Sequence, residues 1–85
     1  MTIYAGNLSL QVNEDDLRGE FRVFGKVAFV NIVKDRNGST SKGFGFIEMP
    51  VQDEAETAIA SLHGKELKGM VIVVNEARPR PFRDY

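Results

Sequence analysis

The stretch Lys42–Met49 reads KGFGFIEM, and its pattern decides how the rest of the chain is expected to fold. Because successive residues of a β-strand point to opposite faces, Phe44 and Phe46 would lie on one face and Ile47 and Met49 on the other. The aliphatic pair suits a core beneath helices, so the two phenylalanines are predicted to face solvent. Exposed apolar patches usually mark a binding site, and this strand is therefore the first candidate for a functional surface.

Further strands are predicted on both sides of this stretch. Residues 26–34 are rich in Val, Ile and Phe and read as a strand. Asp35–Thr40 contains Asn-Gly, the strongest short turn signal, so the strands before and after it should form an antiparallel hairpin. Ile3–Leu8 is expected to be the first strand of the chain, and Met70–Glu76 the last, after a turn at Leu67–Gly69.

Two amphipathic helices are predicted between the strands. Asn13 can cap the first helix and Gly25 is placed to end it. The second helix follows Pro50 and is expected to end at Gly64. The apolar positions that should face the core are Leu17, Phe21 and Phe24 in the first helix and Ala55, Ala58, Ile59 and Leu62 in the second.

The order β-α-β-β-α-β predicts an α+β fold of the ferredoxin-like kind, with a four-stranded antiparallel sheet and both helices packed on one face. A chain of 85 residues allows one small domain. We expect that domain to span residues 1–78 and residues 79–85, with two prolines and no periodicity, to form a flexible tail. The opposite face of the sheet has no sequence left to cover it, so function is expected there.

Alternation predicts which other side chains share that uncovered face. Ile3 and Ala5 suit the core, which turns Tyr4 outward. The same reasoning places Val30 and Ile32 of the second strand inward, and Ile72 and Val74 of the fourth. The remaining outward positions are Phe29, Asn31 and Val33 in the second strand and Val71, Val73, Asn75 and Ala77 in the fourth.

Composition excludes several classes of site. The chain has no cysteine, so a disulfide framework and a thiolate metal site are impossible. His63 has no second histidine to help it build a metal site, and neither a metal nor a cofactor is expected. No nucleophile, base and orienting group stand at a readable spacing, so the chain is predicted not to be an enzyme. The start lacks signal-peptide features and no apolar run approaches the ~20 residues of a membrane span, which favours a cytoplasmic protein.

Charge is distributed unevenly along the chain. It carries 11 basic and 12 acidic side chains, for a formal net charge of −1. Seven of the acids fall in the two predicted helices, whose only basic residues are Arg18 and Arg22. The remainder keeps nine basic residues against five acids. One side of the molecule is therefore expected to repel phosphate while another attracts it.

The octapeptide resembles the signature of the RNA recognition motif family, K/R-G-F/Y-G/A-F-V-x-F/Y. Ile3–Leu8, which reads IYAGNL, is similar to the partner hexapeptide that the family carries on its first strand. The departures, Ala5, Ile47 and Met49, all point into the core and so affect packing more than binding. Within the family the chain is similar to small single-domain bacterial RNA-binding proteins and to glycine-rich RNA-binding proteins, without the glycine-rich tail of the latter.

This resemblance implies single-stranded RNA as the partner of a monomeric protein. Tyr4 and Phe44 should each stack one base, since every base has a flat π-face, and Phe46 should insert between two riboses. Lys42 can pair with a phosphate, and Gly43 and Gly45 are expected to let a helix approach closely. The residues predicted to contact RNA are Tyr4, Asn7, Phe29, Asn31, Lys34, Arg36, Lys42, Phe44, Phe46, Asn75, Ala77, Arg78 and Arg80.

Three questions remain open at the level of sequence. Some domains of this fold bind a protein partner instead, and the acidic helices favour that alternative. Such relatives, however, often lack the exposed aromatic residues of the sheet. Single-stranded DNA offers the same stacking chemistry, because only contacts to the 2′-hydroxyl distinguish RNA. Glu48 shares the exposed face, where it could orient Lys42 or select a base amino group. The expected role is post-transcriptional regulation or RNA chaperoning.

Overall fold

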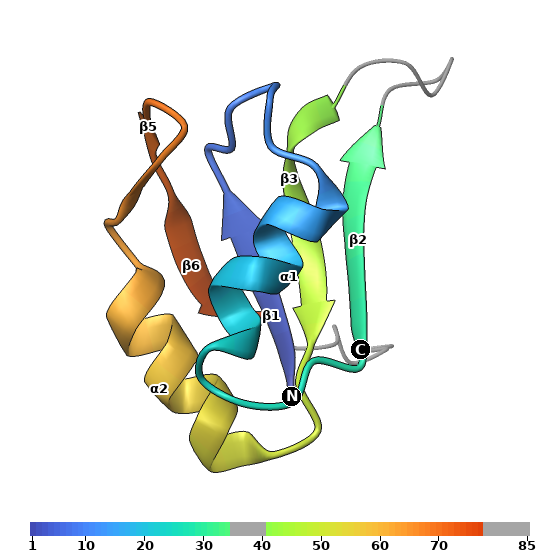
Figure 1. The fold of residues 1–85 in the computed structure, drawn as a ribbon, viewed down its shortest axis with the longest axis vertical. Helices are drawn as coiled ribbons and strands as arrows, with labels where there is room; N and C mark the ends of the chain where they lie inside the picture. The colour runs from blue at the N-terminus through green and yellow to red at the C-terminus, as the bar shows by residue number, and fades with distance from the viewer. Residues whose placement is uncertain (35–40, 78–85) are drawn as a thin grey trace, which may run out of the picture.

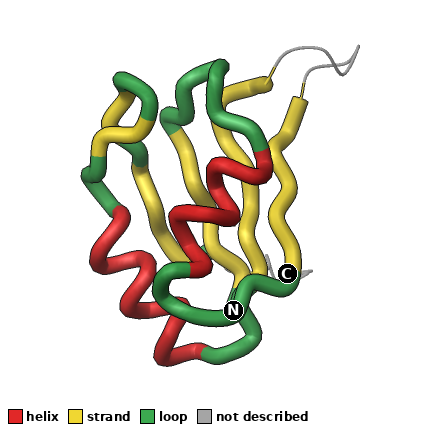
Figure 2. The backbone as a smooth tube through the Cα atoms, viewed as in Figure 1, coloured by secondary structure: helices red, strands yellow, loops and turns green. Residues whose placement is uncertain are grey.

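The computed structural model describes residues 1–34 and 41–77 and contains a small α+β fold (Figure 1). Both helices lie on the same side of the main sheet, and the other side is left open (Figure 2). The elements in chain order are β1 (Thr2–Gly6), α1 (Glu14–Arg22), β2 (Phe29–Lys34), β3 (Ser41–Glu48), α2 (Gln52–Leu62), β4 (Glu66–Leu67), β5 (Met70–Val71) and β6 (Val73–Glu76).

The main sheet has the strand order β2-β3-β1-β6, and every neighbouring pair is antiparallel. This confirms the predicted four-stranded antiparallel sheet with two helices on one face. The expected hairpin of the second and third strands is also present, although the turn Asp35–Thr40 lies outside the described residues. The proposed tail, residues 79–85, lies outside them as well.

The core lies between the sheet and the helices, as alternation predicts. Leu17 and Phe21 of α1 and Ala55, Ala58 and Leu62 of α2 are buried against the sheet, while Phe24 and Ile59 are partly buried beside them. Every side chain predicted to point inward from the strands is buried, namely Ile3, Ala5, Val30, Ile32, Ile47, Met49, Ile72 and Val74.

Helix α1 begins with the cap that the sequence predicts. The Asp16 amide donates to the Asn13 side-chain oxygen at 2.8 Å, and the Asn13 amide donates to the Asp16 carboxylate at 3.0 Å. These reciprocal bonds satisfy two amides that the first helical turn leaves without partners. The bond from the Asn13 amide also holds the pKa of Asp16 below its ordinary value. The helix ends at Arg22, three residues before the expected stop at Gly25.

The predicted last strand, Met70–Glu76, is interrupted at Ile72. The Ile72 amide donates to the carbonyl of Lys65, and the Gly64 amide donates to the carbonyl of Ile72, both at 2.9 Å. These bonds tie Ile72 to the segment that follows α2, so only Val73–Glu76 pairs with β1. The preceding residues form β5, which pairs with β4 in a separate two-stranded sheet that the sequence analysis did not predict.

The expectation that Gly43 and Gly45 make room for a helix is wrong. A Cβ atom on Gly45 would lie 2.5 Å from the carbonyl oxygen of Asn31 and 3.0 Å from the Cα atom of Ile32. Both atoms belong to β2, so Gly45 permits the close approach of the neighbouring strand. Gly43 has a φ of +87°, in the left-handed region, and lies where the β2–β3 pairing shifts register.

Gly45→Ala should therefore destabilise the fold by about 1–3 kcal/mol, because the added methyl group meets rigid backbone on β2 and forces the strands apart. The matched control is Gly19→Ala, since Gly19 is exposed in α1 and has nothing within 4 Å of its Cβ position. That change should stabilise the helix by about 0.5–1 kcal/mol. Urea unfolding of both variants provides the measurement, and equal stability of Gly45→Ala and wild type would contradict the packing argument.

Candidate nucleic-acid interface

The register of the sheet aligns the outward side chains in rows across the four strands. Tyr4 of β1 lies opposite Phe46 of β3 on one side and opposite Asn75 of β6 on the other. Phe46 in turn lies opposite Asn31 of β2. The central row of the uncovered face, which we call the open face, therefore reads amide, phenyl, phenol, amide. Apolar rings in its middle are flanked by groups that can both donate and accept hydrogen bonds.

Three aromatic rings, Tyr4, Phe44 and Phe46, form a cluster at the centre of the open face, which we call the aromatic triad. Ring centroids lie 6.0 Å apart for Tyr4 and Phe44, 5.9 Å for Tyr4 and Phe46, and 6.2 Å for Phe44 and Phe46. All three side chains are partly exposed. These spacings are typical of favourable aromatic pairs, so the rings support one another and still present surface to solvent.

The ring of Tyr4 lies over Gly6, a feature that the sequence analysis missed. A Cβ atom built on Gly6 would lie 2.7 Å from Cζ of Tyr4 and 2.8 Å from its Cε2, too close for any side chain to coexist with the ring as placed. Gly6 does not adopt a positive φ, so its backbone alone would accept alanine. Its missing side chain lets the phenol lean along β1 toward Phe44, which lies opposite Gly6 on β3.

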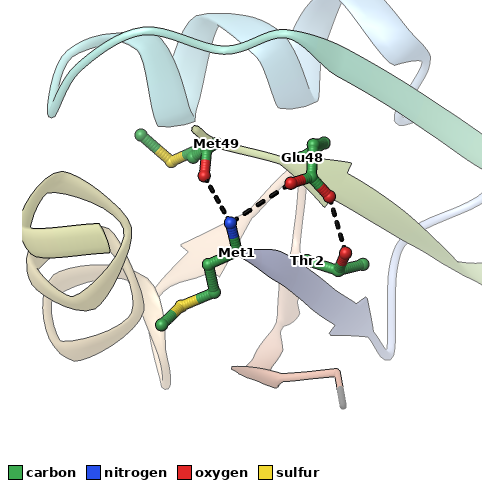
Figure 3. A network of polar contacts seen from close by, with 4 residues as sticks. All are labelled: Met1, Thr2, Glu48 and Met49. Atoms are coloured by element: carbon green, nitrogen blue, oxygen red, sulfur yellow. Dashed lines mark hydrogen bonds and ion pairs between the residues drawn. The ribbon is translucent and has the colours of Figure 1, made fainter. Parts of the chain in front are cut away.

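A second row of the open face carries Phe29, Glu48 and Thr2. Glu48 lies opposite both of the others, one on each neighbouring strand. Its carboxylate accepts a hydrogen bond from the Thr2 hydroxyl at 2.6 Å and pairs with the α-ammonium of Met1 at 3.2 Å (Figure 3). The same ammonium donates to the carbonyl of Met49 at 2.7 Å. The carboxylate is thus held in one orientation at the edge of the aromatic triad.

This network also sets the ionisation of Glu48. The hydrogen bond from the Thr2 hydroxyl, followed by the bond from the Met1 ammonium, holds the pKa of Glu48 below its ordinary value of 4.5. Glu48 is therefore an anion at neutral pH and acts only as a hydrogen-bond acceptor. The sequence placed Glu48 on this face, but its two partners could not be named before the register of β1 against β3 was known.

Asn7 joins the open face to the small second sheet. Its side-chain Nδ2 donates to the carbonyl of Val71 at 2.6 Å, and its φ of +57° lies in the left-handed region. The bond fixes β5 beside the end of β1. Asn7 is exposed at this edge of the open face.

The structure brings most of the predicted RNA contacts onto one surface. Phe29 and Asn31 are exposed on β2, Asn75 is exposed on β6, and Ala77 continues the ladder by donating its amide to the carbonyl of Thr2 at 2.8 Å. Lys34 and Lys42 are placed on strands by their backbone, but their side chains lie outside the description. Arg36, Arg78 and Arg80 lie outside the described residues altogether.

Neither a metal site nor a membrane-spanning helix is found in the part of the chain that the structure describes. Within residues 1–34 and 41–77, no three acidic, histidine or cysteine side chains cluster in a way that could hold a metal ion. Over the same ranges, neither helix has the length and apolar character required to cross a bilayer.

Known proteins that resemble this chain also point to RNA binding. A family model described as the RNA recognition motif matches residues 3–73. A candidate RNA-binding protein named RbpE, from Nostoc sp., is 45% identical over 80 residues, covering 94% of this chain and 81% of the relative. Glycine-rich RNA-binding protein 1 of Mycosarcoma maydis is 42% identical, over 93% of this chain and 45% of that longer protein.

Solved structures include a close match as well. The crystal structure of RNA-binding protein PG1 superposes with a TM-score of 0.89 at 40% identity, and the alignment covers 96% of this chain and 99% of the other. The likeness to small bacterial RNA-binding proteins and to glycine-rich ones, expected from the sequence, is thereby confirmed.

Gly6→Ala should displace the Tyr4 ring while the fold stays intact, because the group that must move is the far end of a flexible side chain. We expect the ring-current shifts of the Phe44 and Phe46 protons to change in NMR spectra, with a melting temperature close to that of wild type. Gly19→Ala serves as control and should leave those shifts unaltered. Unchanged aromatic shifts in Gly6→Ala would contradict the placement of the ring.

Thr2→Val should raise the pKa of Glu48, because valine keeps the shape of threonine but removes the donor that contributes most to the depressed value. A carboxyl group whose pKa is lower in the folded than in the unfolded state stabilises the fold at any pH above the unfolded-state pKa. This stabilisation is lost as the pH falls through the folded-state pKa. The variant should therefore lose less stability in acid than wild type does. Carboxyl-carbon NMR titration measures the shift.

The control for this titration is Thr57→Val, whose hydroxyl donates to the backbone carbonyl of Asp53 within α2 and not to the Glu48 carboxylate. This change should leave the Glu48 titration as it is in wild type. A Glu48 titration that is identical in Thr2→Val and wild type would show that the hydroxyl does not set the carboxylate's ionisation.

Proposed function

The chain belongs to the RNA recognition motif family of non-enzymatic RNA-binding proteins, and from that premise we propose that it captures RNA as a single strand by stacking bases on the aromatic triad. The observation that carries the proposal is the triad itself. Its three rings lie within 6.2 Å of one another on a sheet face that neither helix covers. Such a platform accepts any base and is useless to a base already stacked inside a duplex.

The proposed roles follow from position on the open face. Tyr4 and Phe44 each stack one base. Asn31 and Asn75, at the two ends of the central row, offer donors and acceptors to base edges, and the backbone at Ala77 extends that row. Phosphates pair with basic groups around the platform, for which the sequence offers Lys34, Arg36, Lys42, Arg78 and Arg80.

Two observations bear on which of the two phenylalanines stacks a base and which contacts the riboses. The planes of Tyr4 and Phe44 differ by only 32°, whereas Phe46 stands at 62° to Tyr4 and 88° to Phe44. These angles favour Phe46 as the ring that inserts between riboses. The register offers a second arrangement to be tested, because Phe46 lies directly opposite Tyr4. In that arrangement Phe46 carries the second base and Phe44 contacts the sugars.

The broader setting is proposed on the same grounds. We propose a single domain, residues 1–78, that acts as a monomer in the cytoplasm in post-transcriptional regulation or RNA chaperoning. The alignment with RbpE, which covers 81% of that bacterial relative, supports the single domain. Single-stranded DNA offers the same π-faces and differs by the missing 2′-hydroxyl, so it is the alternative ligand of the same aromatic triad. The presence of all three aromatic rings argues against a domain that binds only protein partners.

Tyr4→Ala and Phe44→Ala should each weaken binding to single-stranded RNA by roughly 1–3 kcal/mol, the value of one base stacked on an aromatic side chain. Fluorescence anisotropy with a labelled oligonucleotide measures the effect, and thermal unfolding checks that each variant folds. Val23→Ala, which truncates an exposed side chain outside the open face, is the control. Affinities within twofold of wild type for both aromatic variants would overturn the stacking proposal.

An abasic nucleotide separates the roles of Phe44 and Phe46 in the same assay. A ring that stacks a base has nothing to stack on when that base is absent, so alanine at its position should cause no further loss. A ring that contacts sugars should keep its effect on the abasic strand. Phe44→Ala and Phe46→Ala, each titrated with intact and abasic oligonucleotides, therefore assign one role to each ring.

A further inference from the structure

The second row of the open face, which lies beside the aromatic triad, combines an exposed ring with an exposed carboxylate. Phe29 is 55% exposed on β2, and the residue opposite it on β3 is Glu48. The next outward residue along β2, Asn31, lies opposite Phe46 of the triad. Two residues of a strand span about 6.6 Å and neighbouring strands lie about 4.8 Å apart. Phe46 is therefore a diagonal step of about 8 Å from Phe29, which the flexible link between neighbouring nucleotides can cover. A base laid on Phe29 would thus continue the path of the bases on the triad.

Glu48 gives this row a defined chemical preference. Each carboxylate oxygen already accepts one hydrogen bond, Oε1 from the Thr2 hydroxyl and Oε2 from the Met1 ammonium. An ionised carboxylate offers about four lone-pair positions, so about half of its capacity is still available. The Glu48 side chain is 40% exposed, which leaves that capacity accessible from the open face.

An acceptor-only group distinguishes bases by the groups on their edges. Cytosine presents an amino group at C4, which a carboxylate can accept from. Uracil carries a carbonyl oxygen at the same position and would place two acceptors against each other. The two pyrimidines have the same ring and the same π-face, so stacking on Phe29 alone would not separate them.

The cost of placing an anion next to a phosphate chain is reduced at this position. The Met1 ammonium lies 3.2 Å from the Glu48 carboxylate, so the pair as a unit is close to neutral. The short bond from Thr2 holds the carboxylate in place, and little side-chain freedom is left to lose when a base binds. A fixed acceptor beside an exposed ring is what selective reading of a base edge requires.

We propose that Phe29 and Glu48 form a nucleotide subsite next to the aromatic triad, which takes a base with an exocyclic amino group and discriminates against uracil. Phe29 supplies the stacking surface, and the Glu48 carboxylate accepts a hydrogen bond from the amino group. Thr2 is a positioning residue, since it acts through Glu48. This subsite rests on the proposed single-stranded RNA binding of the open face.

A cytosine scan tests the subsite. Short oligouridines carrying one cytosine, moved position by position, are titrated against the full chain with an unextended N-terminus. We expect one position at which cytosine binds at least about tenfold more tightly than uracil, in line with one hydrogen bond to a charged acceptor. Glu48→Gln should reduce that preference to less than twofold, because its amide both donates and accepts. Phe29→Ala should abolish the preference and weaken binding of every oligonucleotide of the set.

Glu66→Gln is the matched control, because it removes one exposed negative charge on β4, outside the open face. Any gain in affinity from net charge alone should appear equally in Glu48→Gln and Glu66→Gln, without a change in base preference. Absence of a cytosine preference in wild type, or its persistence in Glu48→Gln, overturns the subsite. If Tyr4→Ala and Phe44→Ala still weaken binding in that case, the subsite fails while the proposed function stands.

Discussion

The antiparallel pairing of β1 with β3 is the constraint on which the rest of this structure depends. It sets Ile3 opposite Ile47 on the core side and Tyr4 opposite Phe46 on the open side. A slip of one residue would bring every side chain of one strand to the wrong face, burying the phenol and exposing the aliphatic core. The same register that closes the core under α1 and α2 therefore assembles the aromatic triad, and folding and function cannot vary independently here.

Two glycines and two short hydrogen bonds help to fix the arrangement of the exposed aromatic rings on the paired strands. Gly45 admits the backbone of β2 at close range, and Gly6 leaves the space that the Tyr4 ring occupies. At the margin of the rings, Thr2 holds the Glu48 carboxylate at 2.6 Å and Asn7 holds β5 through Val71 at 2.6 Å. The apolar centre of the open face is thus framed by groups that are already oriented, which lowers the ordering cost of binding a flexible strand.

Both helices begin with acidic residues. The acids of the helices lie on the covered side, with Glu14, Asp15 and Asp16 in the first turn of α1 and Asp53 and Glu54 in that of α2. Acids at these positions stabilise the helix ends through the backbone dipole. They also disfavour phosphate near the helix N-termini, which fits the proposed binding of RNA on the open face of a chain whose net charge is −1.

The sequence by itself determined the fold class, the core side chains and the identity of the triad, because strand alternation and helix periodicity depend only on local geometry. It could not show that Ile72 bonds to Lys65 and divides the last strand, that Gly45 faces β2 rather than a helix, or that the Tyr4 ring lies over Gly6. Nor could it bring Thr2 and Phe29 to either side of Glu48. Those neighbours come from strands far apart in the chain, and only the tertiary register, set by the packing of the whole core, decides which residues meet.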